Sequence, residues 1–226
     1  MRSFRGAGAS VERSRLGLAS ARGTRSPRTH APRTPCTLER FSVPRAPAPW
    51  WLAEVARALE ETGVEFAICG GLALGEHGYV RVTVGVDLLV TAEGLERFKS
   101  RWLGRGFVEN HPGSRRLRET ETGVAIDFLL AGDYLGDGRP KAVRFPDPAS
   151  IARGGSRLRV LDLRTLIELK LASGISAPDR LRDLADVLEL VRANHLPEDY
   201  AARLDEFVRA KYLELWRAAQ TPPRDL

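Results

Sequence analysis

The 226-residue sequence contains only two cysteines, Cys36 and Cys69, and four histidines that are far apart from one another. Two isolated cysteines form no disulfide framework and no CxxC metal pair, and the histidines show no ligand spacing such as HExxH. No run of about 18 apolar residues occurs, so no membrane-spanning helix is predicted. These absences exclude disulfide scaffolds, zinc-binding modules and membrane-spanning proteins, and we expect a cytoplasmic protein without a membrane partner.

Common nucleotide-binding and hydrolase motifs are also missing. The sequence has no GxxxxGK[ST] phosphate loop, no GxGxxG after a strand and no GxSxG turn. The N-terminus lacks the apolar stretch of a Sec-type signal peptide. Any phosphate chemistry must therefore rest on other residues.

Basic charge is abundant but unevenly distributed. The formal net charge is +6, from 35 basic and 29 acidic residues. Residues 1–48 hold ten arginines and two glutamates and carry +8, whereas 25 basic and 27 acidic residues leave −2 for the rest of the chain. We interpret residues 1–48, which are rich in Arg, Pro and Ser, as a disordered extension. The high net charge is thus a property of this extension and gives no argument for phosphate binding by the folded part.

Hydrophobic periodicity predicts an α+β fold. Apolar residues at helical spacing cover residues 50–62 and, after an N-cap at Thr91, residues 93–103. A short helix is expected over 72–77. Apolar runs bounded by turn residues predict strands at 64–69, 86–90, 107–110, 115–119, 124–130 and 158–161. Because strands and helices do not alternate regularly, the pattern favours a small mixed sheet over a doubly wound one.

From residue 162 onward the pattern is entirely helical. Asp162 is the expected N-cap of the first helix, and the S-x-x-D sequence from Ser176 to Asp179 predicts the start of the second. The predicted helices cover 163–173, 176–194 and 197–219. We therefore expect three parts, which are the extension 1–48, an α+β core over 49–161 and C-terminal helices over 162–226 packed on that core.

Two predicted strands each carry a single carboxylate in an otherwise apolar run. Asp87 lies in the sequence VDLLV and Asp127 in AIDFL. Since side chains alternate between faces along a strand, each aspartate points away from its apolar neighbours. An unpaired buried carboxylate is costly, so these strands favour a solvated cleft, a cation or a hydrogen-bond partner beside each aspartate. The alternative is that each lies on the exposed face of a half-buried strand.

These aspartates belong to a longer series of residues. A predicted strand ends in two glycines, the sequence RVTVGVDLLV follows, and Asp127 lies on a later strand. The series resembles the minimal nucleotidyltransferases of the DNA-polymerase-beta-like superfamily, especially the bacterial abortive-infection toxins of that fold (AbiEii-like). Their signature is a Gly-Gly or Gly-Ser junction, then Arg-x-Thr-x-Asp-[Ile/Val]-Asp-Leu, then a third aspartate. The matching positions are Gly70, Gly71, Arg81, Thr83, Asp87, Leu88 and Asp127.

The resemblance covers residues 64–190 and includes two predicted helices. In the toxin-like members a Leu-x-x-x-Lys helix precedes an Arg-x-x-Asp-Leu-x-Asp helix, and residues 166–170 and 180–186 match this pattern. Lys170 lies on the apolar face of its predicted helix, an unusual place for a charged side chain. From the residues alone, its ammonium either extends past the core to solvent or enters a cleft. The resemblance implies a phosphate contact.

The resemblance also implies an activity. A small mixed sheet of the nucleotidyltransferase fold, flanked by helices, would transfer NMP from an NTP to a hydroxyl of an RNA or protein acceptor in a metal-dependent reaction. A small antitoxin-like protein is the implied partner. Asp87 and Asp127 would be the catalytic residues and the ligands of Mg²⁺ or Mn²⁺. The nucleotide would be bound by Gly70, Gly71, Arg81, Thr83 and Lys170.

One position departs from the family pattern. Gly85 stands where the family has the first aspartate of Asp-x-Asp. Because hard divalent cations depend on oxygen ligands, loss of this carboxylate predicts impaired two-metal catalysis, and Glu76 is a candidate substitute. Two alternatives therefore remain open. One is a catalytically inactive module that binds a nucleotide or a partner protein, as in a toxin–antitoxin-like pair, and the other is RNA binding through residues 1–48.

Overall fold

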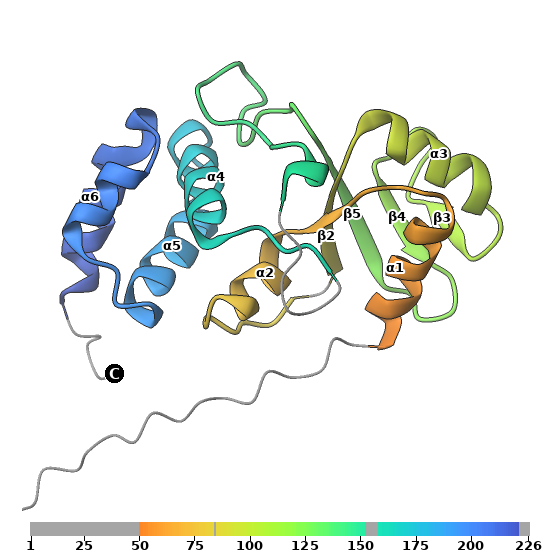
Figure 1. Ribbon diagram of the computed structural model, residues 1–226, viewed down its shortest axis with the longest axis horizontal. Helices are drawn as coiled ribbons and strands as arrows, with labels where there is room; N and C mark the ends of the chain where they lie inside the picture. The colour runs from red at the N-terminus through yellow and green to blue at the C-terminus, as the bar shows by residue number, and fades with distance from the viewer. Residues whose placement is uncertain (1–49, 84, 152–157, 222–226) are drawn as a thin grey trace, which may run out of the picture. The chain divides into compact units, whose positions relative to one another are not determined.

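The computed structural model describes residues 50–83, 85–151 and 158–221 (Figure 1). The predicted extension over residues 1–48 lies outside these ranges and stays a prediction. All described residues belong to one structural unit. Its strands are β1 (Ala67–Ile68), β2 (Gly85–Val90), β3 (Phe107–Glu109), β4 (Arg116–Glu119) and β5 (Ala125–Leu130).

The five strands form one mixed sheet in the order β1-β2-β5-β4-β3. β2 and β5 are parallel, whereas every other neighbouring pair is antiparallel. The parallel pair lies near the middle of the sheet, and the hairpin strands β3 and β4 extend it on one side. A mixed sheet flanked by helices and followed by a helical segment confirms the predicted α+β class.

Six α-helices are described, and two of them begin at the caps that the sequence predicts. The Thr91 side chain accepts a hydrogen bond from Gly94 N (3.0 Å), and Asp162 Oδ1 accepts one from Thr165 N (3.0 Å). The helices are α1 (Trp50–Glu61), α2 (Gly70–Glu76), α3 (Ala92–Trp102), α4 (Leu163–Ser176), α5 (Leu181–Ala193) and α6 (Glu206–Ala219). Two short 3₁₀ helices are η1 (Pro148–Ser150) and η2 (Glu198–Arg203).

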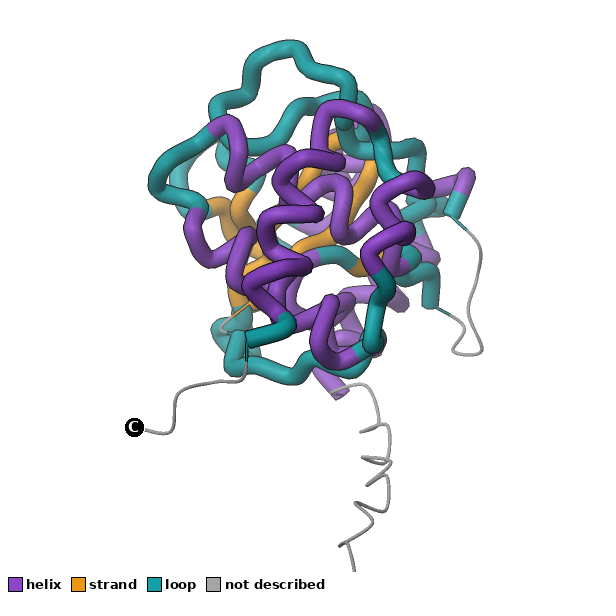
Figure 2. The backbone as a smooth tube through the Cα atoms, turned by 90° about the vertical axis from the view of Figure 1, so that its left-hand side faces the viewer, coloured by secondary structure: helices purple, strands orange, loops and turns teal. Residues whose placement is uncertain are grey.

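The sheet separates two apolar cores. On one face, Val86, Leu88 and Val90 of β2 pack with the buried residues of α1 and α3. On the other face, Leu89 belongs to a cluster that includes buried residues of α2, α4, α5 and α6. Figure 1 shows α4, α5 and α6 side by side, and in Figure 2 helices lie in front of the strands. Alternate residues of β2 therefore face different cores, as expected from strand geometry.

The predicted start of a helix at Ser176 is wrong. Ser176 is the last residue of α4, and its hydroxyl donates back to Ala172 O (2.7 Å). The cause is Pro178, because a residue before proline is restricted to extended conformations, and Ala177 has φ −136° and ψ 112°. Helix α5 begins only at Leu181, without a side-chain cap.

The other differences concern element lengths. The predicted helix 197–219 is divided into η2 and α6 because Leu204 is extended and buried, and Asp205 caps α6 by accepting from Phe207 N (2.9 Å). The predicted strand 64–69 is reduced to the two residues of β1. The predicted strand 158–161 is only a single parallel bridge between Val160 and Ile68. No helix within the described ranges combines the length and apolar character needed to cross a membrane.

Candidate functional site

The two strand aspartates lie next to each other in the sheet. Asp87 of β2 is in direct register with Asp127 of β5, and because paired residues of neighbouring strands share a face, both side chains project from the same face. It is the face of α2, α4 and α5, since the neighbours of Asp87 in β2, Val86 and Leu88, are buried in the opposite core. The sequence expectation that each aspartate points away from its apolar neighbours is confirmed.

The glycine pair makes room for residues of the same site. A Cβ placed on Gly70 would lie 1.8 Å from Asp87 Oδ2, and the φ of Gly70 is +56°, a conformation that favours glycine. A Cβ on Gly71 would lie 3.0 Å from the Thr83 Cβ. Thr83 itself donates a hydrogen bond to Gly85 O (3.0 Å). A side chain at position 70 would therefore collide with Asp87, and one at position 71 would crowd Thr83.

Four of the seven predicted site residues line one cavity of about 340 Å³, namely Gly70, Arg81, Asp87 and Lys170. Gly71, Thr83 and Asp127 are outside its lining. Its apolar lining residues are Cys69, Leu129, Leu135, Phe145, Leu161, Leu166 and Leu169. The charged residues Asp179, Arg180, Arg182 and Asp183 also line it. Such an amphipathic cavity suits a ligand with an apolar or aromatic part and a charged part.

Lys170 is the centre of a buried ionic cluster. Its side chain is only 8% exposed, and Nζ lies 2.9 Å from Asp183 Oδ1 and 2.7 Å from Asp186 Oδ2. Ser173 Oγ donates to Asp183 Oδ2 (2.7 Å). Lys170 therefore does not extend to solvent, and its ammonium is held by two carboxylates of α5 at the cavity wall.

The same cluster binds the segment that precedes β2. Arg81 Nε and Nη2 donate to the two oxygens of Asp186 (2.9 and 3.1 Å), so one carboxylate joins Arg81 to Lys170. Arg180 Nε donates to Asp183 Oδ2 (3.0 Å). We name Arg81, Lys170, Ser173, Arg180, Asp183 and Asp186 the helix cluster. Sequence reasoning noted the motif that contains Asp183 and Asp186 but assigned them no role; their i, i+3 spacing on one helical face was the available signal.

The two groups of carboxylates differ in electrostatic environment. Burial and the neighbouring charge of Asp127 raise the pKa of Asp87, and three nearby cations oppose this rise. Burial alone would raise the pKa of Asp183 as well. The charge of Lys170 and the hydrogen bonds from Lys170 and Ser173 outweigh burial, so the pKa of Asp183 is lowered overall. The Asp87 carboxylate accepts no hydrogen bond from residues in the described ranges, whereas the Asp183 carboxylate accepts hydrogen bonds from Lys170, Ser173 and Arg180.

The donor set does not fit the divalent metal centre that the resemblance implies. Within the described ranges no group of three or more His, Cys, Asp or Glu side chains is placed to hold a metal ion. Gly85 offers no side chain, and Asp127 forms an ion pair with Arg116 (3.2 Å). The candidate substitute Glu76 is the last residue of α2 and is not part of the cavity lining. We therefore derive no step through a metal ion.

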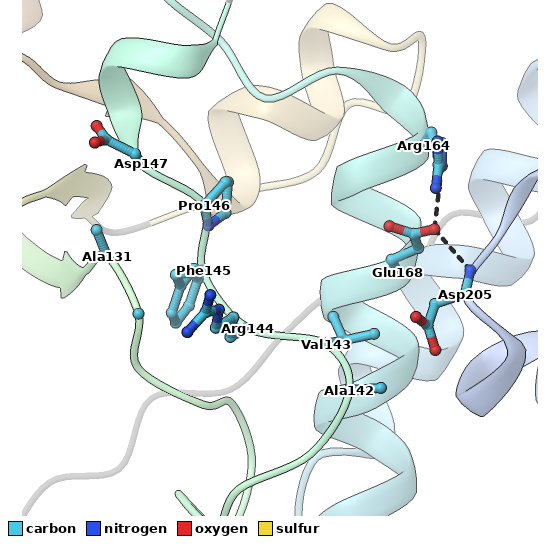
Figure 3. A pocket seen from close by; sticks show the side chains of 11 residues that line it. Ala131, Ala142, Val143, Arg144, Phe145, Pro146, Asp147, Arg164, Glu168 and Asp205 are labelled. Atoms are coloured by element: carbon cyan, nitrogen blue, oxygen red, sulfur yellow. Dashed lines mark hydrogen bonds and ion pairs between the residues drawn. The ribbon is translucent and has the colours of Figure 1, made fainter.

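A second cavity, of about 550 Å³, lies between the loop 131–147 and α4 (Figure 3). None of the predicted site residues lines it, although Phe145 lines both cavities. Glu168 Oε1 accepts hydrogen bonds from Arg164 Nε (3.1 Å) and from Asp205 N (2.8 Å). These contacts hold the start of α6 against α4, so these lining residues of the cavity have a structural role.

No protein-family model matches the sequence, and no curated protein matches it significantly. Matching solved structures include the crystal structure of ANT(2″)-Ia in complex with adenylyl-2″-tobramycin, at 14% identity and a TM-score of 0.47, over 76% of this chain and 98% of that chain. The solution structure of the antibiotic-resistance factor ANT(2″)-Ia matches at 14% identity and a TM-score of 0.36, over 74% and 80%. Because both TM-scores are below 0.5, the site is interpreted from its own residues.

Proposed function

We propose that the chain is a nucleotidyltransferase-fold protein whose cavity binds a nucleotide without supporting metal-dependent transfer. The observation that carries this proposal is the convergence of Gly70, Arg81, Asp87 and Lys170 on one amphipathic cavity. Its volume of about 340 Å³ is at the lower end of the range of small-molecule sites, about 300–1,000 Å³. A ligand with a base and sugar for the apolar residues and a phosphate for the basic residues matches this lining.

The phosphate would meet cations that are still accessible. Lys170 and Arg81 are already neutralised by Asp183 and Asp186. Arg180 also pairs with Asp183, but its side chain is 52% exposed, and Arg182 is exposed and forms no ion pair with residues in the described ranges. We therefore assign the phosphate contact to Arg180 and Arg182, because guanidinium groups bind phosphate oxygens in a bidentate manner.

Calorimetry on the full chain with each of the four NTPs, in Mg²⁺ and then in EDTA, tests this proposal. We expect binding that EDTA does not abolish. Replacing Arg182 with Ala should weaken it about tenfold, the loss of one charge-assisted contact. Arg97→Ala is the matched control, since Arg97 is an exposed arginine of α3, on the opposite face of the sheet. Absence of NTP binding, or equal binding by both variants, would contradict the assignment.

A second candidate is the metal-dependent transfer of NMP to an RNA or protein acceptor. The register of Asp87 with Asp127 favours it, because two adjacent carboxylates are the start of a cation site. Labelled NTPs, Mg²⁺ or Mn²⁺ and acceptor RNA or protein test it directly. Product that forms with the wild-type chain and disappears with Asp87→Asn would establish this function in place of the first.

A further inference from the structure

Three charged residues form a row across the middle of the sheet. Asp87 of β2 is in register with Asp127 of β5, and Asp127 is in register with Arg116 of β4. Arg116 Nε lies 3.2 Å from Asp127 Oδ1. We name Asp87, Asp127 and Arg116 the strand row. A guanidinium therefore flanks Asp127 on the side opposite to Asp87.

Strand geometry places Arg116 on the site face. Leu117, the next residue in β4, is buried in the core of α1 and α3, so Arg116 projects to the other side. The side chains of Arg116 and Asp127 are 50% and 35% exposed, respectively. The pair is therefore accessible to dissolved ions. A dissolved cation would have to compete with Arg116 for the Asp127 carboxylate.

The position of Gly85 reinforces this arrangement. A Cβ on Gly85 would lie 2.8 Å from the backbone oxygen of Ala125, the residue opposite it in β5. Backbone cannot move aside as a flexible side chain can. A divalent cation near the row would thus find Asp87, an Asp127 that is already paired, and no third oxygen ligand from β2.

We propose that Arg116 is a specificity-determining residue that makes ligand binding at this site independent of divalent metal. Its guanidinium supplies, next to Asp127, the positive charge that a divalent cation would otherwise bring. The row then carries a net −1, and without Arg116 it carries −2, a charge that attracts a divalent ion. The inference deepens the proposed function, because it explains why the anionic ligand of the neighbouring cavity needs no metal.

Binding of Mn²⁺ alone to the full chain, followed by electron paramagnetic resonance, tests the role of Arg116. The Arg116→Gln variant should bind Mn²⁺ at least about tenfold more tightly than the wild type, since it removes a positive charge close to the two carboxylates. Adding Asp127→Asn to this variant should abolish the gain. Arg115→Gln is the matched control, because Arg115 pairs with Asp133 outside the row (2.5 Å) and its loss should leave Mn²⁺ binding unchanged.

A second comparison needs only the single variant Asp127→Asn. If Arg116 holds Asp127, the wild-type chain and Asp127→Asn should bind Mn²⁺ equally weakly. Wild-type Mn²⁺ binding that requires Asp127, or an Arg116→Gln variant that gains nothing, would overturn the inference. Calorimetry distinguishes failure of the proposed function from failure of this inference. If the wild-type chain binds no NTP, the proposed function fails, but the Mn²⁺ results are unaffected.

Discussion

The helix cluster and the strand row lie on the same face of the sheet but are built differently. In the helix cluster, the Lys170 side chain is 8% exposed and is paired with two carboxylates that also bind Arg81 and Arg180. In the strand row, the Asp87 carboxylate has no hydrogen-bond partner in the described part of the chain, and the Arg116 side chain is half exposed. Apart from the half-exposed Arg180, the first group is closed by mutual pairing and stabilises the fold. The second group has an exposed cation and a carboxylate without a hydrogen-bond partner in the described ranges, and so can respond to a dissolved ion.

The largest effect is expected from breaking the helix cluster at its centre. Lys170→Met leaves Asp183 and Asp186 buried with less compensation, which costs about 3–5 kcal/mol for a buried pair that loses one partner. Urea unfolding followed by circular dichroism measures this loss. Lys211→Met is the control, because Lys211 pairs with the exposed Glu214 and should change stability by at most about 1 kcal/mol. Equal small losses for both variants would show that the cluster is not stabilising.

A smaller, pH-dependent loss is expected from Asp183→Asn. Hydrogen bonds to charged groups contribute about 1.5–3 kcal/mol, and Asp183 accepts from Lys170, Ser173 and Arg180. Because the pKa of Asp183 is lowered by folding, its contribution is present above the unfolded-state pKa of about 3.9 and is lost as the pH falls through the folded-state value. The stability gap between wild type and variant should therefore shrink on acidification. A gap that is constant with pH would argue against this role.

Gly70→Ala tests the contact between the glycine junction and the strand row. The substitution forces a left-handed φ on a residue with a Cβ, at about 1–2 kcal/mol, and it drives that Cβ against Asp87 Oδ2. Asp87→Ala removes the carboxylate and should recover part of the loss in the double variant. Thermal unfolding of the two single variants and the double variant forms the cycle. Purely additive effects would mean that the two residues do not press on each other.

The smallest effect on stability is expected at Arg116. An exposed ion pair contributes about 0–1 kcal/mol, so Arg116→Gln should unfold at nearly the wild-type urea concentration while its Mn²⁺ affinity changes. Unchanged stability together with a changed Mn²⁺ affinity would distinguish the strand row from the helix cluster most clearly, since Lys170→Met changes mainly stability. A loss of several kcal/mol in Arg116→Gln would instead place Arg116 among the structural residues.

Local chemistry allowed much of the fold to be predicted from the sequence. The caps at Thr91 and Asp162 depend on a hydroxyl or carboxylate next to the first helical N–H groups, and both are observed. The direction of Asp87 and Asp127 follows from the alternation of side chains along a strand. The S-x-x-D pattern at Ser176 is typical of a helix start, but Pro178 restricts Ala177 to an extended conformation, so no helix begins there.

Contacts between distant segments could not be predicted from the sequence in the same way. The pairing of Lys170 with Asp183 and Asp186 depends on how α4 packs against α5. The pairing of Arg116 with Asp127 depends on the register of two strands, and a shift by one residue would place Arg116 on the other face. Such relations are fixed by tertiary packing, so the sequence indicated the charged residues but not their partners.

The closeness of the Ala125 oxygen to the space beside Gly85 limits which side chains position 85 can accept. An aspartate there would bring a third acid close to Asp87 and Asp127, and its Cβ would meet the backbone of β5, which would have to shift. A carboxylate at position 85 would therefore require compensating changes in β5.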